Sequence, residues 1–118
     1  DVATPALDRF GPMLENHPIF PDRANITVAQ VLNDSHVRTR TWERGAGLTQ
    51  ACGSAACATL VCGARLGYLK RSATVSVPGG DLQIEWTEAG RVLMRGPAEH
   101  EYLGEVTIAD DGSVEVNI

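Results

Sequence analysis

The sequence has no long hydrophobic run and no excess of basic residues. No apolar stretch approaches the roughly 18–20 residues of a membrane-spanning helix, and no segment has the pattern of a secretory signal. The 10 Lys and Arg residues are outnumbered by 15 Asp and Glu, which gives a net charge of −5 at pH 7. A negatively charged chain is repelled by the phosphates of nucleic acids and of anionic membranes. We therefore expect neither as a partner.

Cysteine is also scarce, with only Cys52, Cys57 and Cys62 in the sequence. An odd number of cysteines is not a disulfide framework, and the five-residue spacing is not that of a structural zinc site. Steps of five residues turn a helix by about 140°, so the three thiols do not share one face. We interpret Cys57 and Cys62 as buried small hydrophobes. Unpaired cysteines and the lack of metal spacing indicate a reducing, cytoplasmic location and no metal site.

The length of 118 residues suffices for one hydrophobic core, and the composition of 43% hydrophobic and 21% charged residues is that of a globular protein. We expect a single domain over residues 1–118. The first residue is Asp1 rather than Met. We therefore treat the chain as a fragment of a longer protein.

Alternating polar and apolar residues predict that most of the chain forms short strands separated by turns rich in Gly, Pro and Asp. A short helix is expected first, with Thr4 as its N-cap, Pro5 at its first position and Gly11-Pro12 kinking it. The expected strands are residues 25–32, 35–42, 73–77, 81–87, 91–95, 105–109 and 114–117.

The segment from Gly53 to Leu66 breaks this pattern, because almost every residue in it is apolar or small. It predicts a helix that ends at Gly67, a residue suited to a helix C-cap. A helix that is apolar all round belongs inside a protein. The fold class predicted is α+β, with a highly curved, mostly antiparallel sheet or barrel wrapped around this one central helix, which would also reduce the exposed sheet edges.

Cys52 stands at the start of this helix, directly after a glycine-rich loop. A helix N-terminus presents unpaired N–H groups and a partial positive charge, which stabilise a thiolate and can hold a carboxylate. Cys52 is therefore a candidate nucleophile or general acid/base. The alternative is a buried structural cysteine. A Cys–His nucleophile would need His17, His36 or His100 nearby, and the spacing selects none of them.

The pair Glu43-Arg44 ends an expected strand just before the glycine-rich loop. The planar guanidinium of Arg44 suits bidentate binding of a carboxylate. The alternative is an ordinary solvated ion pair at the surface. On pattern alone, Asn25 is a residue at the edge of a strand.

The segment ERGAGLTQACGSAAC (residues 43–57) closely resembles the second catalytic-cysteine motif of the diaminopimelate epimerase family. The resemblance extends to three further segments and so covers nearly the whole chain. They are HPIFPDRAN (residues 17–25), VPGGDL (residues 77–82) and MRGPA (residues 94–98).

Members of this family interconvert LL- and meso-diaminopimelate without a cofactor, in the synthesis of lysine and of peptidoglycan precursors. The resemblance implies a fold of two similar halves, each a curved sheet around a central helix, with the active site in the cleft between them. Each half supplies one cysteine. One cysteine, as thiolate, removes the α-proton from one face, and the other, as thiol, delivers a proton to the opposite face.

By matched position, Cys52 is one of the two acid/base cysteines, and Glu43 helps to bind substrate and to move the proton near Cys52. The backbone N–H groups of Gly53 and Ser54 are expected to bind the α-carboxylate. Two further residues are implied at the distal end of the substrate, with Arg44 on the carboxylate and Asn25 beside the amino-acid group.

The chain departs from the family pattern in having Ala55 where many members have Gly, and in lacking a first cysteine motif and a Gly-Asn-Pro-His segment. It therefore resembles only the C-terminal half of the enzyme. We expect its partners to be the substrate and the N-terminal half. We also expect it to be inactive alone and to form a homodimer through the apolar surface left exposed. The alternatives are a proline racemase-like enzyme, a cysteine-nucleophile hydrolase or transferase, and a non-catalytic domain.

Overall fold

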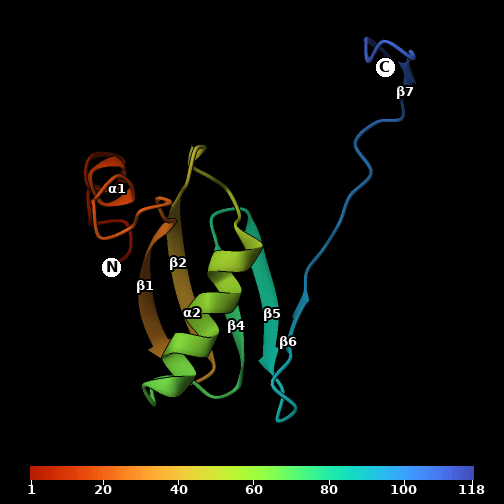
Figure 1. Cartoon of the computed structure of the whole chain (residues 1–118). Coiled ribbons are helices and arrows are strands. Elements are labelled where there is room, and N and C mark those ends of the chain that lie inside the picture. The colour runs from red at the N-terminus through yellow and green to blue at the C-terminus, as the bar shows by residue number, and fades with distance from the viewer.

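The computed structural model describes all residues from 1 to 118 and contains two helices and eight strands (Figure 1). Neither helix is both long enough and apolar enough to cross a membrane. In chain order the elements are α1 (Leu7–Glu15), β1 (Ile26–Asn33), β2 (His36–Glu43), β3 (Gly47–Leu48), α2 (Gly53–Arg65), β4 (Ser72–Val77), β5 (Gly80–Trp86), β6 (Val92–Arg95), β7 (Glu105–Ile108) and β8 (Val114–Asn117). The α+β class predicted from the sequence is confirmed.

Strands β1 to β6 form one sheet in the order β1-β2-β4-β5-β6, with the short β3 added to β2. Neighbouring strands are antiparallel except β2 and β4, which run parallel because α2 connects them across the sheet. The prediction of a mostly antiparallel sheet is thus confirmed. Of the two forms predicted, a curved sheet or a barrel, the barrel is wrong for this chain, since β1 and β6 stay at opposite edges and do not pair.

The core lies between α2 and one face of the sheet (Figure 1). Leu60 of α2 is fully buried, and so are Val37 and Val75, which stand side by side on the parallel strands β2 and β4. Ala73 and Ile84, which pair across β4 and β5, complete the contact. The same face of each strand therefore points at the helix, as the period of two in the sequence requires.

Helix α2 ends as the sequence predicts. Gly67 has a φ of +83°, its N–H donates to the carbonyl of Ala64, and the N–H of Tyr68 donates to that of Gly63. These two bonds make a Schellman cap, which needs a residue with positive φ.

The outward side of α2 is not covered. Ser54, Ala58 and Cys62, at intervals of four residues, are exposed along it. The burial expected for Cys62 is therefore wrong, because an open sheet shields only one side of the helix, while Cys57 on the inner side is half-buried. That the sheet wraps around the helix stays a prediction.

Helix α1 packs against β1, β2 and β3 at the end of the sheet that carries the loop before α2. It begins at Leu7 with Ala6 as its N-cap, so the start predicted at Thr4 and Pro5 is wrong. Those residues instead form a turn, in which Thr4 N–H donates to the carbonyl of Asp1. Gly11 lies against Trp42 so closely that an added Cβ would stand 2.4 Å from the indole Cγ.

Strands β7 and β8 form a separate two-stranded hairpin (residues 105–117), which Figure 1 shows at the end of a long extended segment, away from the main body (residues 1–95). The radius of gyration is 17.4 Å, against about 13.5 Å for a compact chain of this length. Both strands were predicted from the sequence. Their apolar residues nevertheless remain exposed, among them Val106, Ile108, Val114 and Val116.

Candidate active site

Cys52 is the N-cap of α2, in an extended conformation with φ −139° and ψ 102°. Its residue surface is 7% exposed, so the thiol is almost covered by protein. No side chain caps this end of the helix. The backbone N–H groups of Gly53 and Ser54, in the first turn, have no intrahelical partner, and they lie directly beside the sulfur in the chain. The predicted placement of Cys52 at a helix N-terminus is therefore observed.

Two polar side chains approach the sulfur from different elements. The Nδ2 of Asn25, just before β1, lies 3.9 Å from Cys52 Sγ. The Oγ of Ser54, in the first turn of α2, lies 3.5 Å from the same atom. Both are long contacts of the kind sulfur makes, with Asn25 donating in the first and either group able to donate in the second. The structure thus brings Asn25 to Cys52, although 27 residues separate them.

Glu43, the last residue of β2, faces the thiol as well. Hydrogen bonding from the Cys52 thiol, and secondarily from Thr49, holds the pKa of the Glu43 carboxyl below its ordinary value. Neither contact is a well-formed hydrogen bond in the structure, since Thr49 Oγ1 is buried without a partner and the sulfur has Asn25 and Ser54 as its partners. The lowered pKa keeps Glu43 a carboxylate at neutral pH.

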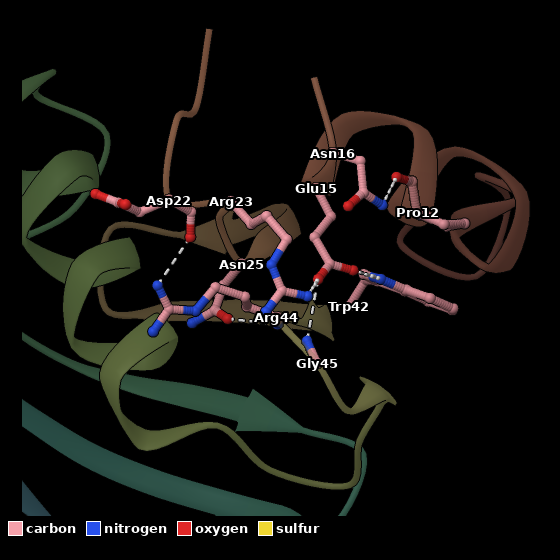
Figure 2. A network of polar contacts seen from close by, with 9 residues as sticks. All are labelled: Pro12, Glu15, Asn16, Asp22, Arg23, Asn25, Trp42, Arg44 and Gly45. Carbon is pink, nitrogen blue, oxygen red and sulfur yellow. Dashed lines mark hydrogen bonds and ion pairs between the residues drawn. The ribbon is translucent and has the colours of Figure 1, made fainter. Parts of the chain in front are cut away.

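Arg44 is tied to Asn25 through its backbone. Its N–H donates to Asn25 Oδ1 over 2.8 Å, and its guanidinium Nη1 donates to the carbonyl of Asp22 over 3.0 Å, as Figure 2 shows. The residue is otherwise exposed. The guanidinium is therefore held by one bond to a loop carbonyl and is free to bind an anion from solvent.

Glu15 lies behind this group and was not identified from the sequence. Its Oε1 accepts from Trp42 Nε1 over 2.9 Å, while its Oε2 accepts from the N–H of Gly45 over 3.0 Å and from Arg23 Nη1 over 3.2 Å (Figure 2). Glu15 is spaced four and eight residues from Gly11 and Leu7, the other buried residues of α1, and so lies on the buried face of this helix. An acid on a buried stripe needs partners.

Two segments that also carry the family resemblance, residues 77–82 and 94–98, contact the loop before Cys52 and the first turn of α2. The N–H of Gly79, in the turn between β4 and β5, donates to the carbonyl of Gln50 over 2.7 Å. A Cβ on Gly53 would stand 3.0 Å from Cε of Met94, on β6. The turn between β4 and β5 thus holds the loop before Cys52, and β6 packs against the first turn of α2.

The histidines are engaged elsewhere. His36 Nε2 lies 2.7 Å from Ser76 Oγ, and His17 Nδ1 accepts from the N–H of Ile19. His100 is exposed in the extended segment after β6. None forms a hydrogen bond with Cys52, so the arrangement of a cysteine–histidine nucleophile is not present. No group of three or more His, Cys, Asp or Glu side chains is arranged to hold a metal ion.

An open, mostly apolar groove of about 710 Å³ runs between β1 and the outward side of α2. Asn25 and Ser54, both close to Cys52, line it along with Ala58 and Cys62 further down the helix. The groove and the thiol therefore meet at the N-terminus of α2.

Comparison with known proteins agrees with this geometry. A family model described as diaminopimelate epimerase matches residues 1–101. The diaminopimelate epimerase of Rhizobium meliloti (strain 1021) is 61% identical over 107 residues, which are 90% of this chain and 36% of that protein. The diaminopimelate epimerases of Brucella canis (strain ATCC 23365) and Brucella abortus (strain S19) are each 60% identical over 104 residues, 88% of this chain and 34% of theirs.

The chain thus spans about a third of the length of these curated relatives. The residues that surround the thiol all lie within residues 1–101, the range that the family model matches. On these grounds, the chain belongs to the diaminopimelate epimerase family.

Proposed function

We propose that this chain is part of an isomerase that interconverts LL- and meso-diaminopimelate, and that Cys52 is one of its two acid/base residues. The observation that carries the proposal is the position of the Cys52 sulfur. It is nearly buried at the uncapped N-terminus of α2 and faces Glu43, Asn25 and Ser54. The family match supports diaminopimelate as the substrate of this thiol.

The chemistry requires removal of a very weakly acidic α-proton, so the developing negative charge must be stabilised. The N–H groups of Gly53 and Ser54 at the positive end of α2 bind the α-carboxylate and stabilise that charge. Cys52 takes or gives the proton on one face of the α-carbon. Glu43, ionised and near the thiol, accepts and returns the proton of Cys52. No cofactor takes part in these steps.

At the distal end of the substrate, Arg44 binds the second carboxylate and Asn25 the neighbouring amino group. The single bond from Arg44 to the carbonyl of Asp22 is exchanged for a bidentate pair with the carboxylate. The hydrogen bond from the Arg44 backbone N–H to the Asn25 side chain keeps the two residues side by side during this exchange.

Residues 1–118 form the C-terminal part of the parent protein, and an N-terminal half supplies the second cysteine and closes the cleft. The sheet is wrapped around α2 in that full-length protein. Support for this comes from the open edge of β1, from the groove beside it, and from the exposed row on α2. The enzyme is cytoplasmic and binds neither nucleic acid nor membrane.

Cut off from the rest, the chain folds but does not epimerise, and it self-associates as a homodimer through its exposed apolar surfaces. Light scattering at high concentration checks the association. A strict monomer would contradict it.

The activity is tested in the parent protein with matched thiol variants. Cys52→Ser is expected to lower the rate of conversion of LL- to meso-diaminopimelate by at least about a hundredfold. Cys62→Ser, ten residues further along the same helix, is expected to keep the activity within about twofold. A parent protein without epimerase activity, or a Cys52→Ser variant as active as the Cys62→Ser control, contradicts the proposal.

The isolated chain offers a second test, by stereochemical analysis of LL-diaminopimelate after incubation in deuterated water. We expect no stereoinversion from one cysteine and an open cleft. Robust inversion by the chain alone would contradict the division of the two bases between halves.

A further inference from the structure

We propose that Glu15 is a positioning residue for the Cys52 site, because its buried carboxylate fixes both segments that bring polar groups to the thiol. This inference rests on the proposed function of Cys52 as an acid/base. It concerns a residue on α1, whose carboxylate reaches the site only through its hydrogen-bond partners.

The first segment is the end of β2 and the turn after it. The two carboxylate oxygens of Glu15 bind Trp42 and Gly45, the residues on either side of the pair Glu43-Arg44. Gly45 has a φ of +78°, so the chain turns there in a conformation that favours glycine. A bond to the Gly45 N–H fixes this turn at its start and so fixes the direction in which Glu43 and Arg44 leave the sheet.

The second segment is the approach to β1. Arg23 forms an ion pair with Glu15 at 3.2 Å and has a φ of 62°, an unfavourable conformation for a residue other than glycine. Asn25 follows two residues later, and its amide faces Cys52 Sγ. The ion pair therefore holds the backbone that presents Asn25.

The two segments meet where the N–H of Arg44 donates to Asn25 Oδ1. A continuous path thus leads from Glu15 through Gly45, Arg44 and Asn25 to Cys52, and all of its links except the sulfur contact are seen in Figure 2.

The carboxylate itself is well suited to this task. Glu15 is 6% exposed, and its side chain has three donors from three different parts of the chain. Burial of a charge is costly unless such donors are in place. The Trp42 indole and then the Gly45 N–H hold the pKa of Glu15 below its ordinary value, with a smaller contribution from Arg23. The carboxylate is therefore ionised and bound at neutral pH.

Glu15→Gln is the informative variant. It preserves the shape of the side chain, but its single oxygen cannot accept from both Gly45 and Trp42, and its neutral amide forms no ion pair with Arg23. Glu15→Asp keeps the charge but has a side chain shorter by one methylene. It is the second variant, used if Glu15→Gln does not fold. Glu88→Gln, in the exposed turn between β5 and β6, is the matched control.

Two readouts use the 118-residue chain itself. Hydrogen exchange is followed at the amide of Gly45, with Leu60 in the core as reference. Alkylation of Cys52 by iodoacetamide is followed across pH, with peptide mapping to separate it from Cys62. In Glu15→Gln we expect exchange at Gly45 to quicken by about tenfold and the pH profile of Cys52 alkylation to move. Exchange at Leu60 and alkylation of Cys62 are expected to stay as in the control.

A third readout uses the parent protein, where Glu15→Gln is expected to lower kcat by about tenfold with a smaller change in KM. The proposal is overturned if Gly45 exchange and the Cys52 profile are unchanged in both Glu15 variants. It is also overturned if they change only together with Leu60 and Cys62, since that is general unfolding. A parent protein that does not epimerise, with the first two readouts as expected, contradicts the proposed function but supports the positioning role.

Discussion

The main body and the C-terminal hairpin contain the same kind of strand and differ in what the strands pack against. In the main body, alternate residues of β2, β4 and β5 face α2 and are buried, as Val75 and Ile84 show. In the hairpin, Val106 pairs with Val116 and Ile108 with Val114, yet all four remain exposed. An isolated two-stranded hairpin is at best marginally stable.

The alternation of polar and apolar residues therefore specifies a strand but not the element that packs on it and stabilises it. The main body contains both the sheet and the helix that covers it, whereas the hairpin has an apolar face and no covering element within this chain. The candidate site belongs wholly to the main body. Its geometry should therefore not depend on the hairpin.

The largest difference is expected from shortening an apolar side chain in each region. Leu60→Ala, in the main body, should lower the free energy of unfolding by about 2–5 kcal/mol, because it leaves a cavity under a fully buried residue. Val116→Ala, in the hairpin, should change it by less than about 0.5 kcal/mol. Urea denaturation followed by far-ultraviolet circular dichroism measures both. An equal loss of unfolding free energy in the two variants would mean that the hairpin packs against the core of the main body.

A smaller effect is expected from filling a close backbone contact. In Gly11→Ala the new Cβ would stand 2.4 Å from Trp42, and overpacking of this kind costs about 1–3 kcal/mol. The matched change in the other region is Gly104→Ala, whose Cβ would stand 2.9 Å from the carbonyl oxygen of Asn117.

We expect the first variant to lower the denaturation midpoint and to alter tryptophan fluorescence, and the second to leave the midpoint of the main body unchanged. A Gly11→Ala protein as stable as the parent chain would show that α1 does not pack firmly on Trp42.

The pH dependence of the free energy of unfolding in acid should also differ between the two regions. The pKa of Glu15 and the pKa of Glu43 are both lower in the folded chain than their ordinary values. The unfolded chain therefore binds more protons in acid, and the stabilisation is present at neutral pH and lost as the pH falls through the folded pKa values. Glu15→Gln should make the unfolding free energy less dependent on pH below about 4.5.

Asp111 in the hairpin also has a lowered pKa, because the side chain and N–H of Ser113 donate to it. We expect Asp111→Asn to leave the acid dependence of the main body unaltered. An acid dependence that follows Asp111 rather than Glu15 would contradict the separation of the two regions.

The smallest effect on stability is expected from deleting residues 96–118. The denaturation midpoint of the main body should change by no more than the equivalent of about 0.5 kcal/mol, and self-association should weaken because the apolar hairpin is gone. Light scattering and urea denaturation of the shortened chain measure the two outcomes. A large loss of stability would show that the hairpin packs on the main body.

Local patterns predicted most of the fold. The strands expected at residues 73–77 and 81–87 are observed within one residue, and the C-cap at Gly67 is observed as predicted. The start of α1 was wrong because Thr4 is held in a turn by Asp1. Strand β3 was missed because two residues, Gly47 and Leu48, carry no periodicity and pair only through contact with β2.

Less of the candidate site could be predicted from local sequence patterns. Cys52 at a helix N-terminus was predicted from the glycine-rich approach, but Asn25 was singled out only through the family resemblance. Glu15 was missed because its partners Trp42 and Gly45 lie 27 and 30 residues away. The burial of a carboxylate is decided by such distant donors, and no spacing within α1 encodes them.

The central claim, that Cys52 is one of two acid/base residues, is tested most directly by following the α-hydrogen of the substrate. The measurement is NMR of LL- and of meso-diaminopimelate in deuterated water with the Cys52→Ser parent protein. We predict that inversion is lost and that deuterium enters only one of the two isomers, with retention, from the cysteine that remains. Inversion at the unaltered rate, with deuterium entering both isomers, would contradict the claim.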